Sequence, residues 1–283
     1  MPQNNEIVDR NGYLARMTGP LQDKLRPTIY FPRNTRAILD IGCADGSVTI
    51  EMAKMFPKAL VRGIDLDSGF IITAQKNAEA QKVENVVFEQ AFIRDVLDRN
   101  DKYDVTSTSS TNHEIAHYDP DKRRALVVAL SRMGSLLRDE QSVMAVRDMI
   151  LHQSMQTATF MMPQVIEKIR QQTEVATQLK DFEDLFGHLR TQEQVNHFLL
   201  KYFYTQNWDR ELREHYLPYT VEEYNQLLPL MDMQIIHQKY YLLPFIKNKW
   251  IHDFGLTEAE VNVFGSTGMI IASKKAKGSG IIG

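Results

Sequence analysis

The chain has 283 residues, of which 43% are hydrophobic and 24% charged, so it is long enough to bury a sizeable core in one large or two smaller domains. Its net charge of -3 supplies no bulk positive field for attracting nucleic acid, although a local basic patch is not excluded. Because Cys43 is the only cysteine and neither a signal-peptide core nor an apolar run of roughly 20 residues is present, we expect a cytoplasmic protein without a membrane span.

Residues 1–30 predict an amphipathic N-terminal helical cap. From 31 to 150 the pattern alternates between strand and helix, which is typical of a parallel sheet with helices on both faces. Strands are expected at 37–41, 59–64, 86–90, 103–109 and 142–146. Helices are expected from Ser47, from near Ser68 and after the Asp119-Pro120 pair, whose acceptor and proline are typical of a helix start.

Residues 151–232 break this alternation and predict a helical insertion that serves as a substrate cap or a partner surface. Thr191 with Gln194, and Thr220 with Glu223, have the spacing of capping boxes. Segments 233–243 and 268–274 are apolar enough to be two further strands, so 233–275 completes the core, and 276–283 is expected to be a flexible tail.

The most informative pattern is a glycine turn after the first strand, with an acid after the second. Asp40, Gly42 and Gly46 lie in ILDIGCADG at 38–46, and Asp65 ends the strand LVRGID. A glycine turn lets the backbone approach a ligand, and an acid about twenty residues later can hold two ribose hydroxyls. The pair predicts a nucleoside-containing cofactor at the carboxyl ends of parallel strands.

The details of the turn narrow the choice of cofactor. A dinucleotide fingerprint needs a middle glycine where this chain has Ala44, and no G-K-[ST] follows, which excludes a P-loop. DIGCADGS instead resembles the first motif of the class I S-adenosylmethionine-dependent methyltransferases, with Ala44 departing from the middle glycine. The resemblance implies that Asp40 and the Gly42–Cys43 backbone lie near the methionine part of the cofactor and that Asp65 binds its ribose.

Later segments extend the resemblance. NVVFEQAF at 85–92 looks like the third strand and adenine loop, with Ala91-Phe92 where the family often has Gly-Asp. Segments 103–115 and 136–148 look like the fourth and fifth strands, with Arg138-Asp139 in place of the usual Pro-Gly. The implied fold is α/β, a doubly wound, mostly parallel seven-stranded sheet with a final antiparallel strand. The implied S-adenosyl-L-methionine contacts are Asp40, Gly42, Cys43, Ala44, Gly46, Asp65, Leu66, Ala91, Phe92, Ser109 and Ser110.

The loop after the fourth strand concentrates groups suited to catalysis. His113 and Glu114 are the predicted catalytic residues, because a hydroxyl acceptor needs its proton removed and histidine titrates in the useful range. His113 could equally cap the next helix or pack under the cofactor. His117 is predicted to bind substrate, with a surface role as the alternative. These three residues raise the question of a metal, but no third ligand is evident from spacing, so none is predicted.

Two absences narrow the chemistry. The loop lacks the [DNS]-P-P-[YF] pattern usual for methylation of exocyclic amino groups in DNA, and Cys43 is badly placed to attack a pyrimidine carbon. Arg147, at the end of the fifth strand, is predicted to bind substrate or to pair with Asp148. In the insertion, Trp208 and Arg210 are also predicted to bind substrate, since aromatic and arginine side chains can stack bases and contact phosphates. Helix packing is the alternative for both.

The sequence as a whole predicts a methyltransferase that acts on an oxygen or nitrogen of a small-molecule acceptor, with the insertion covering the pocket. An RNA- or nucleotide-directed methyltransferase is one alternative. An inactive cofactor-binding scaffold subunit is another, suggested by Ala44 and Phe92. A homodimer through the insertion remains open.

Overall fold

A computed structural model describes residues 20–93, 96, 102–117, 122–150, 161–203, 205–214, 216 and 219–276. The side chains of Ala116, His117 and Lys122 are outside this description. Within the described chain, no helix is both long and apolar enough to cross a bilayer. The predicted cap at 1–19, the start at Asp119-Pro120 and the tail from 277 lie outside the described residues.

Seven strands form one sheet in the order β3-β2-β1-β4-β5-β7-β6. The strands are β1 (Ala37–Ile41), β2 (Leu60–Asp65), β3 (Val86–Gln90), β4 (Val105–Ser109), β5 (Val143–Asp148), β6 (Met233–Tyr241) and β7 (Thr267–Lys274). Strands β1 to β5 pair in parallel, and β7 is antiparallel to both of its neighbours. The predicted fold class is therefore confirmed, including the antiparallel strand.

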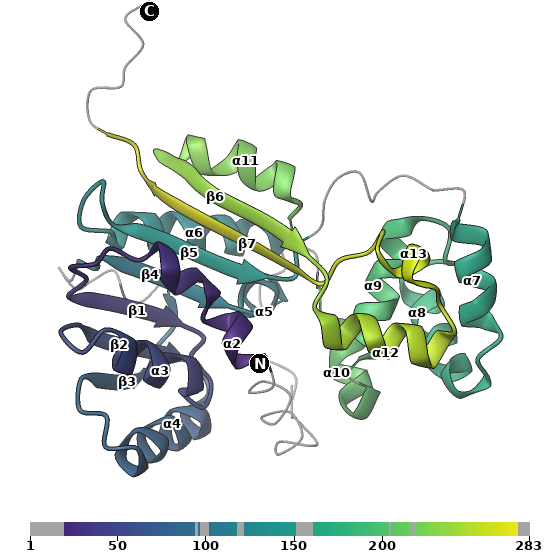
Figure 1. The fold of residues 1–283 in the computed structure, drawn as a ribbon, viewed down its shortest axis with the longest axis horizontal. Helices are drawn as coiled ribbons and strands as arrows, with labels where there is room; N and C mark the ends of the chain where they lie inside the picture. The colour runs from purple at the N-terminus through teal and green to yellow at the C-terminus, as the bar shows by residue number, and fades with distance from the viewer. Residues whose placement is uncertain are drawn as a thin grey trace, which may run out of the picture.

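The helices fall into two groups, one on the sheet and one beyond it (Figure 1). They are α2 (Leu21–Lys24), the 3-10 helix η1 (Arg26–Tyr30), α3 (Ser47–Met55), α4 (Ser68–Ala80), α5 (Asn112–His117), α6 (Lys122–Leu136), α7 (Met162–Arg170), η4 (Thr173–Val175), α8 (Ala176–Phe186), α9 (Gln192–Tyr202), η5 (Thr205–Asn207), α10 (Trp208–Arg213), α11 (Val221–Leu230), α12 (Pro244–Phe254) and α13 (Glu258–Val261).

Alternate side chains of the strands bury against helices on opposite faces, as the two-residue period of a strand requires. Leu39 and Met144 belong to a core with α6 and α11. Ile38 and Ala145 belong to a second core with α3 and the N-terminal segment. This burial on both faces explains why the central strands are apolar throughout.

A helical lobe lies beyond the carboxyl ends of the parallel strands (Figure 1). Two separate segments build it: 161–216, with α7 to α10, and 243–264, with α12 and α13. Trp250 on α12 is fully buried in the lobe's own core, and its indole N–H donates to the carbonyl of Leu199 at 3.1 Å. Helix α11 instead packs on the sheet beside β6.

The sequence signals for helix starts hold in detail. Both capping boxes, at Thr191 and at Thr220, form in full. Gly46 precedes α3 with a φ of +78° and Asp67 caps α4 through its side chain. The domain boundaries at 30, 150, 232 and 275 stay predictions.

Candidate functional site

The turn after β1 is shaped by a close approach to the loop after β4. Gly42 has a φ of +73°, and a Cβ atom there would lie 2.3 Å from the side chain of Thr111. The amides of Gly42 and Cys43 both donate to the carbonyl of Ile64 on β2, at 2.8 and 3.0 Å. Glycine is therefore required at position 42 on two counts, conformation and space.

Asp65 at the end of β2 is held by two backbone amides. Its Oδ2 accepts from the N–H of Ala44 at 2.9 Å, and its Oδ1 accepts from the N–H of Asp67 at 3.0 Å. Burial raises the pKa of Asp65, and the amides of Asp67 and Ala44 oppose that rise. These bonds fix the carboxylate at the rim of a cleft, with lone pairs left for further donors.

That cleft runs along the carboxyl ends of β1 and β2 and holds about 850 Å³ of empty space. Glycine and alanine form one wall, Asp65 supplies an acceptor, and Leu66, Phe70 and Phe92 supply apolar surface. This combination fits a nucleoside with two ribose hydroxyls and a planar base. Asp40 lies beneath the turn, where Thr49 donates to its carboxylate at 2.6 Å and burial raises its pKa to about 6.

A second cavity, with about 760 Å³ of empty space, adjoins the first. Ser110 and Glu114 line both cavities. The second cavity lies between strand ends and the helical lobe: the sheet contributes Arg147 and Asp148, and the lobe contributes, among others, Leu200, Phe203, Glu211, Glu214, Tyr216, Phe245 and Ile246. A ligand in the first cavity and one in the second would therefore meet at a shared wall.

His113 and Asp148 form a buried pair on that wall. The Nδ1 of His113 lies 2.7 Å from Oδ1 of Asp148, and the amide of His113 donates to Oδ2 at 3.2 Å. Burial lowers the pKa of His113, but the charges of Asp148, Glu114 and Glu214 outweigh it and raise the pKa to about 9. With Nδ1 engaged, the ring presents Nε2 towards Glu214.

The lobe adds a cluster of buried charges around the end of α10. Arg210 bridges two elements, because its Nη2 lies 2.8 Å from Oε1 of Glu114 and its Nε lies 2.7 Å from Oε1 of Glu214. Lys201 donates to the backbone carbonyls of Glu211 and Glu214. Burial and the charge of Glu214 raise the pKa of Glu211 to about 8.

Most of the residues predicted from sequence come together here. Those that line the first cavity are Gly42, Ala44, Asp65, Leu66, Ala91, Phe92, Ser110 and Arg210, with Glu114 shared between the cavities. His113 and Arg147 line the second. Asp40, Cys43, Gly46 and Ser109 are buried behind the linings.

Other predicted residues lie elsewhere. Trp208 is packed in the lobe core, where its indole N–H donates to Asp181 at 3.0 Å, and it lines neither cavity. Arg147 bonds to Asp23 through Nε and Nη2, so the predicted pairing with Asp148 is replaced by one with the N-terminal segment. The side chain of His117 is outside the described residues.

Several residues in or beside the second cavity are not predicted from the sequence: Lys24, Glu211, Glu214 and the adjoining Lys201. Glu211 lies on α10 and Glu214 is the residue that follows this helix, so the i, i+3 spacing of the two acids was a usable signal. However, their partners His113 and Glu114 lie about a hundred residues earlier in the chain.

Comparisons with known proteins show the family of the chain. The family model described as a methyltransferase domain matches residues 33–214. The chain is 38% identical over 68 residues to release factor glutamine methyltransferase of Flavobacterium psychrophilum, covering 24% of each. It is 40% identical over 62 residues to malonyl-[acyl-carrier protein] O-methyltransferase of Halalkalibacterium halodurans, covering 22% of each. These matches span about a quarter of the length of the curated relatives.

Among solved structures, PKMT2 from Rickettsia typhi in complex with AdoHcy superposes with a TM-score of 0.56 at 17% identity. The superposition covers 90% of this chain and 52% of that one. At this identity the likeness concerns the fold alone.

Proposed function

The chain belongs to the methyltransferase domain family, and from that premise we propose that it transfers a methyl group from S-adenosylmethionine to an oxygen or nitrogen of a small-molecule acceptor. The observation that carries the proposal is the pair of adjoining cavities with a shared wall at Ser110 and Glu114. The first has the shape and the acid of a nucleoside site. The second opens beside a histidine held by a carboxylate.

Particular residues would hold the cofactor in the first cavity. Asp65 is placed to accept from the ribose hydroxyls, while Phe92 and Leu66 offer apolar surface to the base. The backbone at Gly42 allows close approach because it carries no side chain. When bound, S-adenosylmethionine supplies an electrophilic methyl group on a sulfonium centre.

His113 is the residue that we assign to the acceptor. Asp148 fixes the Nδ1–H and leaves Nε2 to accept a proton from the acceptor's hydroxyl or ammonium group. Since displacement at a methyl group needs close and aligned partners, the main task of the second cavity is to position the acceptor. Tyr216 packs edge-on against the imidazole at 5.4 Å and limits its rotation.

A small acceptor is favoured because the second cavity is roofed by the lobe. Its lining includes Leu200 and Phe203 from the end of α9 and Phe245 from α12. An RNA acceptor receives less support, because Trp208 is packed in the lobe core and Arg210 is paired with Glu114 and Glu214. A scaffold role receives less support because the cofactor cleft is complete in spite of Ala44 and Phe92.

The test is calorimetric titration with S-adenosylmethionine and S-adenosylhomocysteine, followed by a screen of small hydroxyl and amine acceptors. Micromolar binding of either cofactor form, together with methylation of an acceptor that is lost in His113→Ala, is the expected result. Failure of both to bind would contradict the proposal.

A further inference from the structure

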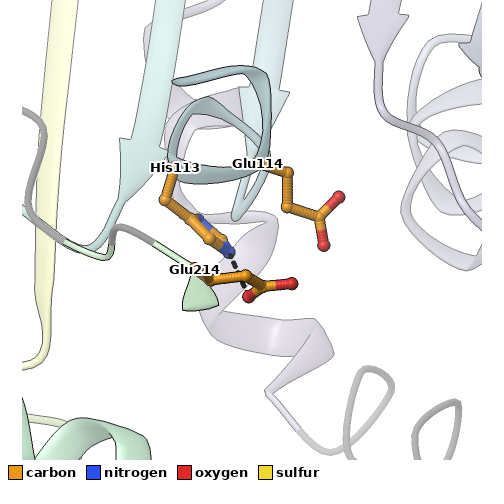
Figure 2. A group of neighbouring side chains, drawn as sticks. All are labelled: His113, Glu114 and Glu214. Atoms are coloured by element: carbon orange, nitrogen blue, oxygen red, sulfur yellow. Dashed lines mark ion pairs between the residues drawn. The ribbon is translucent and has the colours of Figure 1, made fainter. Parts of the chain in front are cut away.

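Three potential metal ligands converge on the shared wall from elements far apart in sequence. His113 and Glu114 begin α5, and Glu214 follows the last residue of α10. One ligand atom from each lies within 4.8 Å of the other two (Figure 2). The His113 Nε2 lies 4.0 Å from Oε2 of Glu214, too far for a hydrogen bond and close enough for two ligands of one ion.

Each of the three side chains is oriented by a contact on its other side. Asp148 holds Nδ1 of His113 at 2.7 Å. Arg210 donates a hydrogen bond from Nη2 to Oε1 of Glu114 at 2.8 Å, and its Nε forms an ion pair with Oε1 of Glu214 at 2.7 Å. A metal-binding histidine almost always gives its second ring nitrogen to a carboxylate or carbonyl, and metal-binding carboxylates are themselves hydrogen-bonded. Oε2 of Glu214 is directed at the imidazole, as Figure 2 shows.

An independent observation in the same cavity concerns a third carboxylate, that of Glu211. Glu211 lines the cavity, its side chain is almost completely buried, and its Oε2 has no hydrogen-bond partner in the described structure. A buried carboxylate oxygen without a partner is costly unless a ligand satisfies it. Glu211 also interacts electrostatically with both Glu214 and His113.

We propose that His113, Glu114 and Glu214 bind one divalent transition-metal cation at the wall between the two cavities. One imidazole and two carboxylates form a mixed nitrogen and oxygen set, which suits Mn²⁺, Fe²⁺ or Zn²⁺ better than Ca²⁺. In this arrangement Arg210 remains paired with the Oε1 atoms of Glu114 and Glu214. The cation is bound by Oε2 of Glu214, Nε2 of His113 and one carboxylate oxygen of Glu114.

On the proposed function, this position gives the cation a role in the reaction. Glu114 lines both cavities, so a bound ion would lie beside an acceptor in the second cavity. It would bind the acceptor's oxygen and favour the deprotonated form. His113 would then act as a metal ligand, and the ion, in place of His113, would favour deprotonation of the acceptor.

The experiment is titration of the chelator-treated full chain with Mn²⁺, followed by the EPR signal of the free ion. We expect one Mn²⁺ per chain, and a loss of affinity of tenfold or more in His113→Ala and in Glu214→Gln. Asp148→Asn, which changes the partner of His113 Nδ1 without removing a proposed ligand, should weaken binding about 10- to 100-fold. Glu114→Gln serves as the further variant if either of the first two fails to fold.

Asp184→Asn is the matched control, because Asp184 is an exposed acid of the lobe paired only with Lys180 in the described structure. It should leave Mn²⁺ binding unchanged. No binding by Mn²⁺ or Zn²⁺ below millimolar concentration, or equal binding by wild type and by the ligand variants, would overturn the site. Titration of the same samples with S-adenosylhomocysteine separates the two proposals: if it binds and the metal does not, only the metal site is lost.

Discussion

Asp65 is the residue whose removal tests the cofactor site most directly. In Asp65→Ala the carboxylate no longer accepts from the ribose, and each charged hydrogen bond lost is worth on the order of 1.5–3 kcal/mol. We therefore expect S-adenosylhomocysteine to bind at least about tenfold more weakly in calorimetry. Glu84→Ala, an exposed acid before β3, is the control. Equal affinity in both variants would remove Asp65 from the site.

The protonation state of His113 makes the activity of the site depend on pH. Because its pKa is raised to about 9, the ring is protonated at neutral pH and a base at Nε2 becomes available only as the pH rises through that value. We expect turnover to rise with pH over this limb in the metal-free protein. Asp148→Asn removes the charge that most raises the pKa of His113, so the limb should move to lower pH.

A pH–rate profile of the wild type and of Asp148→Asn measures the direction in which the limb moves. In His113→Ala, turnover should fall far more than cofactor affinity. A limb that stays in place in Asp148→Asn would assign it to another group of the second cavity: Glu211, whose pKa is raised by burial to about 8, or Lys24, whose pKa is lowered by burial to about 8.

At the scale of elements, one buried ion pair ties the N-terminal segment to the sheet. Asp23 on α2 accepts from Nε and Nη2 of Arg147 on β5, at 2.8 and 2.6 Å, and from the hydroxyl of Tyr241 at 2.9 Å. Asp23→Ala leaves the Arg147 charge buried without this partner, which costs about 3–5 kcal/mol. The expected fall in Tm is roughly 6–20 °C.

Two further variants test that explanation. Asp23→Leu combined with Arg147→Met should recover much of the loss, because the unpaired charge is gone. Asp184→Ala, which breaks an exposed pair with Lys180, should leave the Tm almost unchanged. A similar Tm for Asp23→Ala and Asp184→Ala in calorimetry would show that burial does not set the strength of the Asp23 pair.

The elements near the cofactor were predictable because their signals are local. The glycine turn, the acid at the end of β2 and the two capping boxes each lie within a few residues, and the structure places them as expected. Glu211 and Glu214 were not predicted, because their partners His113 and Glu114 are about a hundred residues away. Trp208 was assigned by residue type, and type alone does not distinguish a base-stacking ring from a packed one.

At the scale of the whole molecule, cofactor binding should stabilise the fold as a unit. A ligand that binds only the folded chain adds about 2.7 kcal/mol when it is present at a hundred times its Kd. S-adenosylhomocysteine at that concentration should therefore raise the Tm by roughly 5–10 °C in scanning calorimetry. Asp65→Ala, with about tenfold weaker binding, should show only about half of this shift at the same concentration. An equal shift in both would mean that the ligand binds elsewhere.

The helical lobe is built from two separate segments of the chain, 161–216 and 243–264, and this sets the order in which its parts fold during synthesis. Its core needs Ile246, Trp250 and Phe254 from α12, which leave the ribosome long after α7 to α9. The apolar face of the earlier helices therefore stays uncovered until α12 has been synthesised. Strand β7, which lies between β5 and β6 in the sheet, is synthesised later still. On a translating ribosome, both the roof of the second cavity and the closed sheet are among the last parts to be completed.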